Sequence, residues 1–281
     1  MKFSFATSCI DHPDCARYAI DFAIEHGFNG IEFNAPDLYL ADLNKADRDY
    51  LVSASNEHGF RNTHHFPPSA LPGSHDAERR VKDLVSLISE IKVAGELGVK
   101  VIVLHPGRLD VAGVEREDVS EVDRALAMSY YIDFVKSAAP IAEESGVMIG
   151  LENMHYNPGW VIRSHEELAE SVDRVDSSAV GITFDVGHAW GSGGVEAGIN
   201  ILGDRITHVQ VHDARGPEGA RNVKDQHKEI GTGLIDWAAD APVGKFVAEN
   251  GFVAAIETSG FVDNREEICL RSLDLLHDLW N

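Results

Sequence analysis

The chain has 281 residues, of which 44% are hydrophobic and 25% are charged, a composition ordinary for a soluble globular protein. Its 46 acidic and 24 basic residues give a net charge of −22, which disfavours nucleic acid and anionic membrane surfaces as partners unless a local basic patch overrides it. No apolar run has the length of a membrane span, and three scattered cysteines (Cys9, Cys15, Cys269) indicate neither a disulfide framework nor a Cys-rich zinc site. We therefore expect a cytoplasmic protein with reduced thiols and without a signal peptide. Two explanations of the acidity stay open, an adaptation to high salt and a merely acidic enzyme.

Short runs rich in Val, Ile and Phe alternate with longer segments of helical periodicity, and this alternation occurs eight times along the chain. The predicted strands span residues 2–6, 30–34, 62–66, 100–105, 148–153, 181–185, 207–212 and 253–258. The predicted helices span residues 14–25, 45–58, 77–97, 121–144, 165–175, 195–202, 234–250 and 265–280. Glycines follow several of these helices, where a left-handed C-cap is expected.

Eight strand-then-helix units with short connections predict an α/β protein with a parallel sheet, and eight strands are the number that closes into a (β/α)8 TIM barrel. A doubly wound open sheet is the competing fold. It usually carries a Gly-rich phosphate-binding turn after its first strand, and residues 8–11 (Ser-Cys-Ile-Asp) do not resemble one. We therefore predict one TIM-barrel domain over residues 1–281.

Acidic and imidazole side chains occur at the end of each predicted strand from the third to the eighth. In chain order they are His64, His65, His105, Glu152, Asp185, His188, His208, His212, Asp213 and Glu257, with Asp225 and His227 in the loop after the seventh strand. A single residue of this kind is usually a hydrogen-bonded polar group, but six strand ends deliver them to the same rim. Glu152 and Glu257 also lie in apolar runs, where an unpaired carboxylate would be costly. The pattern predicts a site for Mn²⁺, Mg²⁺, Co²⁺ or Zn²⁺ with oxygen and imidazole ligands.

Three segments carry a resemblance to a known family. They are residues 184–188 (Phe-Asp-Val-Gly-His), residues 211–213 (Val-His-Asp) and residues 225–237, which run from Asp-Gln-His to Asp-Trp through Gly-Thr-Gly. Together with the order of the strand ends, they resemble the xylose isomerase-like TIM barrel superfamily. This superfamily includes sugar phosphate isomerases and epimerases and the endonuclease IV group.

The resemblance implies metal ligands at matching positions, for one to three divalent ions in each chain. Glu152, Asp185 and Glu257 match the ligands of a central ion. His65, His105 and Glu152 match the set of a second ion, and His188, Asp225 and His227 match the set of a third. One position departs from the family, because Gln210 stands where a metal-binding histidine is usual. Its amide oxygen is a weaker and neutral ligand, so the affinity and preference of the central site stay open.

Two reactions fit such a site. The first is isomerisation or epimerisation of a sugar or sugar phosphate through a metal-stabilised enediolate, with Glu152 and Glu257 as base and acid and His188 positioning a substrate oxygen. The alternative is metal-dependent phosphodiester hydrolysis at abasic sites, which the full ligand set favours and the acidic charge disfavours. The basic residues Arg215, Arg221 and Lys224 either hold a substrate phosphate or form a solvated loop. A barrel that binds metal without catalysis is the third possibility, and the oligomeric state stays open.

Overall fold

The eight predicted strands form one closed parallel barrel. The computed structural model describes residues 1–220, 226–258 and 264–280. The strands are β1 (Lys2–Ala6), β2 (Ile31–Asn34), β3 (Thr63–His65), β4 (Val101–Leu104), β5 (Met148–Glu152), β6 (Val180–Asp185), β7 (Ile206–Val211) and β8 (Val253–Ile256). Each strand pairs with the next in chain order, and β8 pairs with β1 to close the barrel. The predicted TIM barrel is therefore confirmed.

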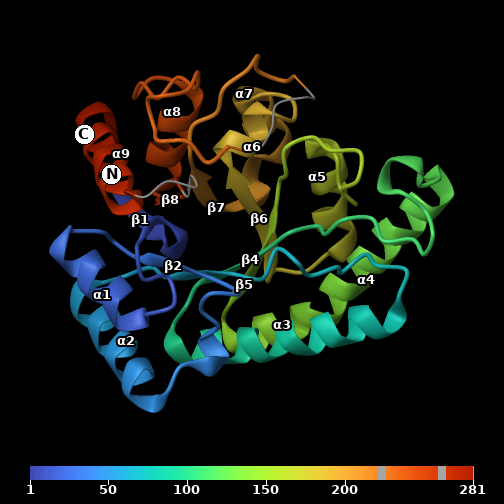
Figure 1. The fold of residues 1–281 in the computed structure, drawn as a ribbon, viewed down its shortest axis with the longest axis horizontal. Coiled ribbons are helices and arrows are strands. Elements are labelled where there is room, and N and C mark those ends of the chain that lie inside the picture. The colour runs from blue at the N-terminus through green and yellow to red at the C-terminus, as the bar shows by residue number, and fades with distance from the viewer. Residues whose placement is uncertain (221–225, 259–263, 281) are drawn as a thin grey trace.

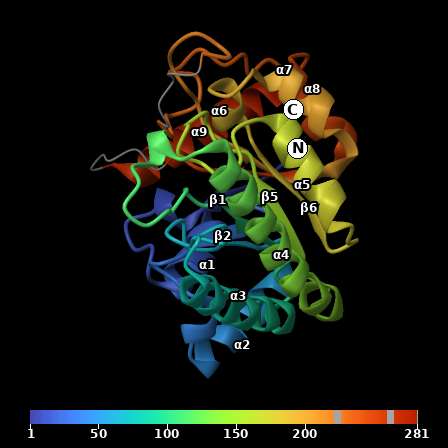
Figure 2. The same ribbon diagram turned by 90° about the vertical axis from the view of Figure 1, so that its right-hand side faces the viewer.

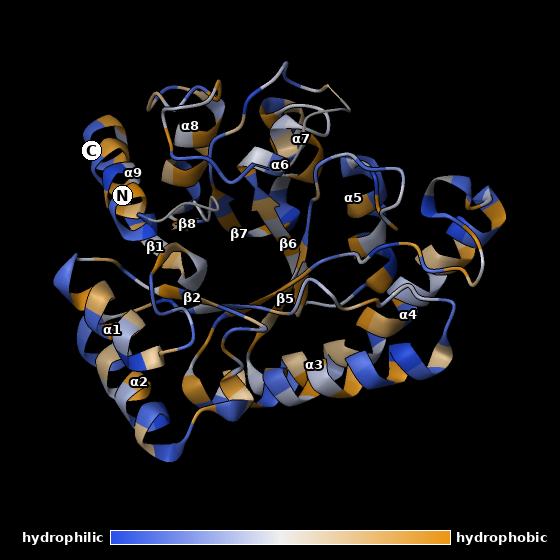
Figure 3. Ribbon diagram, in the orientation of Figure 1, coloured by the Kyte–Doolittle hydropathy of each residue, from blue (hydrophilic) through white to orange (hydrophobic). Residues whose placement is uncertain are grey.

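Helices surround this barrel and connect successive strands (Figures 1 and 2). They are α1 (Ala16–Glu25), α2 (Lys45–His58), α3 (Ala77–Leu97), α4 (Glu121–Ser145), α5 (His165–Val175), α6 (Val186–Trp190), α7 (Val195–Leu202), α8 (Pro242–Asn250) and α9 (Arg265–Trp280). Hydrophobic and hydrophilic residues alternate along helices such as α3, as Figure 3 shows. The apolar residues pack on the strands, and Leu87 and Ile91 of α3 are fully buried. This is the burial pattern of helices that cover a parallel sheet.

Two helices differ from the prediction. The helix predicted over residues 234–250 begins only at Pro242, which occupies its first turn, where a missing N–H costs nothing. The backbone N–H of Ile235 instead donates to the carboxylate of Asp213, 3.2 Å away, so residues 234–241 belong to the preceding loop. The short helix α6 was not predicted, because five residues containing a glycine give no helical period.

Candidate metal centre

Several acidic and imidazole residues of the strand ends and the loop after β7 line one cavity of about 280 Å³: His65, His105, Glu152, His188, His227 and Glu257. Its lining residues are Ser8, Asn34, Ala35, Asp37, His65, Pro68, His105, Glu152, His188, His227 and Glu257. His65 and Glu152 are the last residues of β3 and β5, whereas His105 and Glu257 directly follow β4 and β8. Parallel strands of a barrel all end at the same rim, which explains how residues almost 200 positions apart meet.

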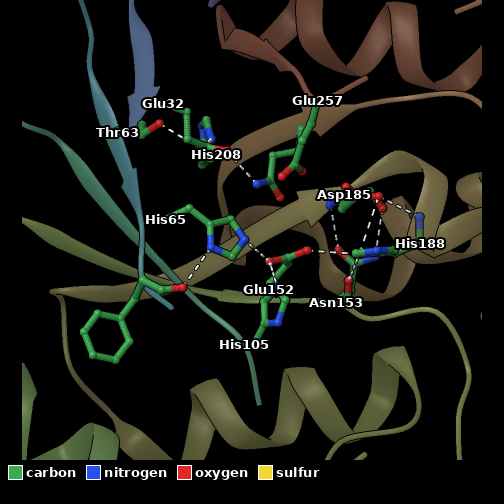
Figure 4. A network of polar contacts seen from close by, with 12 residues as sticks. Glu32, Thr63, His65, His105, Glu152, Asn153, Asp185, His188, His208 and Glu257 are labelled. Atoms are coloured by element: carbon green, nitrogen blue, oxygen red, sulfur yellow. Dashed lines mark hydrogen bonds and ion pairs between the residues drawn. The ribbon is translucent and has the colours of Figure 1, made fainter. Parts of the chain in front are cut away.

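Glu152 is the centre of this arrangement (Figure 4). Its Oε2 lies 2.9 Å from Nε2 of His105 and 3.3 Å from Nε2 of His65, and its Oε1 lies 3.0 Å from Nδ1 of His188. None of these contacts has hydrogen-bond geometry, so both carboxylate oxygens are buried acceptors without a hydrogen bond from the described residues. Burial alone would raise the pKa of Glu152, but the charge of His105 and the contacts with the three histidines hold it well below its usual range.

Asp185 ends β6 and begins α6. Its Oδ1 accepts a hydrogen bond from the backbone N–H of His188, 2.6 Å away, and lies 3.1 Å from Nε2 of His212. The side-chain amide of Asn153, the residue after β5, makes two hydrogen bonds with the backbone of Asp185. It donates to the carbonyl oxygen at 2.9 Å and accepts from the N–H group at 2.8 Å. The other oxygen, Oδ2, is buried and accepts no hydrogen bond within the described part of the chain. Asp185 is thus rigidly held with one oxygen left for another partner.

Backbone carbonyls fix the orientation of four imidazoles. Nδ1 of His65, His188, His212 and His227 lies 2.8–3.2 Å from the carbonyl oxygens of Phe66, Asn153, Asp213 and Glu257, respectively. A carbonyl oxygen can only accept, so each Nδ1 carries the proton and, in the neutral ring, Nε2 carries the lone pair. This is how metal-ligating histidines are commonly oriented by their surroundings. Nε2 of His65 and of His212 nevertheless face carboxylates, an arrangement that requires a proton or a cation between the two groups.

Within the described part of the chain, three groups of side chains could hold a metal ion, because the donor atoms within each group lie within 4.8 Å of one another. They are His65–His105–Glu152, Glu152–Asp185–His188 and His188–His212–His227. The first coincides with one predicted ligand set. The third joins His188 and His227 as predicted, but with His212 as a further member; Asp225 lies outside the described residues. The sequence analysis assigned His212 to none of the ligand sets. His212 lies two residues after Gln210, so in a strand the two side chains point to the same face, which puts His212 near the rim.

Glu257 faces the cavity from the end of β8, and its side chain points toward the same central space as Glu152 (Figure 4). Burial raises its pKa to about 8; the nearby His227 and His65 act in the opposite direction, and Glu32 and Glu152 add to the rise. At neutral pH one cavity therefore contains an ionised carboxylate, Glu152, and a protonated one, Glu257. Such a pair of unequal acids is typical of acid–base catalysis.

His208, the third residue of β7, does not line the cavity. Its Nε2 donates to Glu32 inside the barrel, 2.8 Å away. Arg215 also has a local role, because its guanidinium donates to the carbonyl of Thr232 at 3.2 and 3.3 Å. Arg221 and Lys224, the other members of the predicted basic group, lie outside the described residues. Among the described residues that line the cavity, none is Lys or Arg.

Comparisons with known proteins agree with this architecture. The family described as xylose isomerase-like TIM barrel matches residues 20–277. An uncharacterized protein of Methanocaldococcus jannaschii is 30% identical over 285 aligned positions, which cover 99% of this chain and 91% of that protein. A probable endonuclease 4 of Methanoculleus marisnigri is 31% identical over 184 positions, which cover 61% of each chain. The solved structure of a D-tagatose 3-epimerase-like protein has 26% identity and a TM-score of 0.77, with 99% of both chains covered.

No helix in residues 1–220, 226–258 and 264–280 has the length and apolarity that a membrane crossing needs.

Proposed function

Since the chain belongs to the xylose isomerase-like TIM barrel family, we propose that it is a divalent-metal-dependent isomerase or epimerase of a sugar or sugar derivative. The observation that carries this proposal is the pairing of Glu152 and Glu257 in one cavity, in opposite protonation states, beside groups of metal-ligating type. Members of this family include sugar epimerases and endonuclease 4 proteins, so the family alone leaves the reaction open.

The side chains fit a divalent ion well. Oxygens of Glu152, Asp185 and Glu257 are buried and accept no hydrogen bond from the described residues, and a buried carboxylate is costly unless a cation or a donor faces it. Glu152, Asp185 and Gln210 would hold a central ion, and the flanking imidazole groups would hold others. When bound, such an ion would polarise a substrate carbonyl and neighbouring hydroxyl and stabilise negative charge that develops on their oxygens.

The two glutamates would move the protons. Glu152 is ionised at neutral pH, so it can accept the proton from the carbon between the carbonyl and hydroxyl groups. Glu257 is protonated, so its carboxyl can return a proton to the neighbouring or the same carbon. Return to the same carbon from the opposite face gives an epimer, whereas return to the former carbonyl carbon gives an isomer. His188, whose ring is fixed by Asn153, would position a substrate oxygen.

The lining favours an uncharged substrate of monosaccharide size. The cavity of about 280 Å³ is at the small end of the range for ligand sites. Its lining also includes Ser8, Asn34 and Asp37, which suit hydroxyl groups. A phosphate would meet carboxylates there without a Lys or Arg among the described lining residues.

Abasic-site phosphodiester hydrolysis is the second candidate. Two observations favour it: the additional imidazole group His188–His212–His227, and the similarity to a probable endonuclease 4. The net charge of −22 and the cavity lining work against it.

The two functions are separated by assaying the metal-loaded protein in D₂O against a panel of free ketoses and aldoses and, in parallel, against abasic DNA. We expect deuterium to enter the carbon next to the carbonyl of at least one sugar, with loss of the activity after chelation. Glu152→Gln should lower the rate by about 10²–10⁴-fold. Asp49→Asn, which removes an exposed acid of α2 paired with Lys45, is the matched control and should leave the rate unchanged. Chelator-sensitive nicking of abasic DNA, with no exchange into any sugar, would overturn the proposal in favour of the nuclease.

A further inference from the structure

A buried carboxylate that lies below the cavity determines how Gln210 is oriented. Glu32, on β2, is completely buried and accepts three hydrogen bonds of 2.8 Å. The donors are the hydroxyl of Thr63 and Nε2 of His208, both on Oε2, and the amide nitrogen of Gln210 on Oε1. Figure 4 shows Glu32, Thr63 and His208 grouped on the opposite side of the central space from His188.

Glu32 accepts all three of these hydrogen bonds, so its carboxyl group acts as the acceptor for each neighbour. The atom of Gln210 that lies 2.8 Å from Oε1 of Glu32 is the amide nitrogen, which donates. The amide oxygen of Gln210 must then point away from Glu32.

That oxygen belongs to a set of unsatisfied acceptors. Oε1 of Gln210 is buried and has no hydrogen-bond donor in the described part of the chain, and the same holds for oxygens of Glu152, Asp185 and Glu257. Gln210 and Asp185 are directly paired residues of neighbouring strands, so their side chains point to the same face of the sheet. Buried acceptors without donors are costly, and a cation that faces them would remove that cost.

We infer that Glu32 is a positioning residue that fixes the amide oxygen of Gln210 as a ligand of a hard divalent cation, Mn²⁺ or Mg²⁺, beside the carboxylate oxygens of Glu152 and Asp185. This inference rests on the proposed function only in requiring that the cavity binds metal. The site differs chemically from the histidine-containing groups around it. Carboxylate and amide oxygens suit Mg²⁺ and Mn²⁺, whereas imidazoles suit Zn²⁺. We therefore expect Mn²⁺ or Mg²⁺ at the oxygen site and Zn²⁺ at the neighbouring histidine-containing groups.

Two substitutions test this inference. Glu32→Gln removes the charge that selects the NH₂ group, so the amide of Gln210 can turn and present its nitrogen to the ion. We expect Mn²⁺ affinity, measured by electron paramagnetic resonance titration, to fall about 10–100-fold, the usual effect of losing a group that orients a ligand. Gln210→His provides an imidazole that Glu32 can still orient. It should shift the Zn²⁺-to-Mn²⁺ ratio bound in competition by at least about tenfold toward Zn²⁺, as measured by plasma mass spectrometry.

Asp49→Asn, which changes an exposed acid of α2 paired with Lys45, is the matched control and should leave the Mn²⁺ resonance intact. Circular dichroism reports whether the variants fold, and Gln210→His keeps the test valid if Glu32→Gln does not. Unchanged Mn²⁺ affinity and Zn²⁺-to-Mn²⁺ ratio in both folded variants would refute the role of Glu32 and Gln210 while leaving the proposed function intact. A wild-type protein that binds no divalent ion would refute both.

Discussion

At the scale of single residues, Gly187 explains the glycine in the segment Phe184–Asp185–Val186–Gly187–His188. A Cβ atom placed on it would lie 1.9 Å from Cε1 of His212, so the imidazole occupies the space of a side chain. The absence of a side chain thus lets α6 pack against the end of β7. This one turn brings His188 to the cavity and holds it next to Asp185, the N-cap of the same helix.

Gly187→Ala should displace the ring of His212. We expect the free energy of unfolding to fall by about 1–3 kcal/mol, the usual cost of overpacking a buried site, and Zn²⁺ binding to weaken. Urea unfolding and Zn²⁺ titration measure these effects. Gly159→Ala is the control, because a Cβ there would approach no atom closer than 3.2 Å. Equal stability and Zn²⁺ affinity in Gly187→Ala and wild type would show that His212 does not depend on this glycine.

At the scale of elements, Asp213 organises the loop after β7. Its carboxylate accepts hydrogen bonds from the backbone N–H groups of Gly231 and Gly233, both at 2.9 Å, and from Nε1 of Trp237 at 3.1 Å. A Cβ on Gly233 would lie 2.1 Å from Oδ1 of Asp213, which explains the second glycine of the Gly-Thr-Gly run. The backbone of Asp213 also pairs with that of Lys228, the residue after His227. Asp213, which has a structural role, therefore positions His227, a candidate metal ligand.

Asp213→Asn should loosen this loop, because an amide NH₂ would replace an acceptor that faces several N–H donors. We expect a loss of about 3 kcal/mol in the free energy of unfolding, since buried donors lose a charged acceptor. Thermal and urea unfolding measure it. Asp236→Asn is the control with a much smaller expected loss, because exposed Asp236 accepts a single hydrogen bond, from the N–H of Ala238. Equal losses in the two variants would contradict the role of Asp213.

The barrel and the order of its strands could be predicted from the sequence, because each buried strand is a short apolar run followed by a helical period. The helical periodicity gave a wrong prediction for residues 234–241. Their apolar residues have the spacing of a helix, but a hydrogen bond to Asp213 holds the backbone in a loop. At the site, strand-end positions sufficed to bring His65, His105, Glu152 and Glu257 to one cavity. The direction of the Gln210 amide could not be predicted. It depends on Glu32, which lies on β2 and contacts β7 only across the barrel interior.

At the scale of the whole molecule, metal binding and protonation are linked. In the metal-free protein, burial alone would lower the pKa of His65, but the contact and charge of Glu152 raise it to about 9, and the pKa of Glu257 is raised to about 8. The unfolded chain releases these protons near the ordinary pKa values of Glu and His, whereas the folded, metal-free chain keeps them until about pH 8 and about pH 9. The metal-free protein therefore loses stability as pH rises to about 9. A bound ion replaces the protons, so its stabilising effect should grow over the same range.

The metal content of the purified protein at two pH values tests the central claim, that the rim of the barrel is a divalent-metal centre built around Glu152. After dialysis at pH 8, plasma mass spectrometry should find at least about one divalent ion per chain and at most one for each of the three ligand groups. Dialysis near pH 5.5 should lower this content, because protons compete for His65 and Glu257. Glu152→Gln should lower it at both pH values, because Glu152 belongs to two of the groups. A wild-type protein without bound metal at pH 8, even after incubation with Mn²⁺ and Zn²⁺, would contradict the claim.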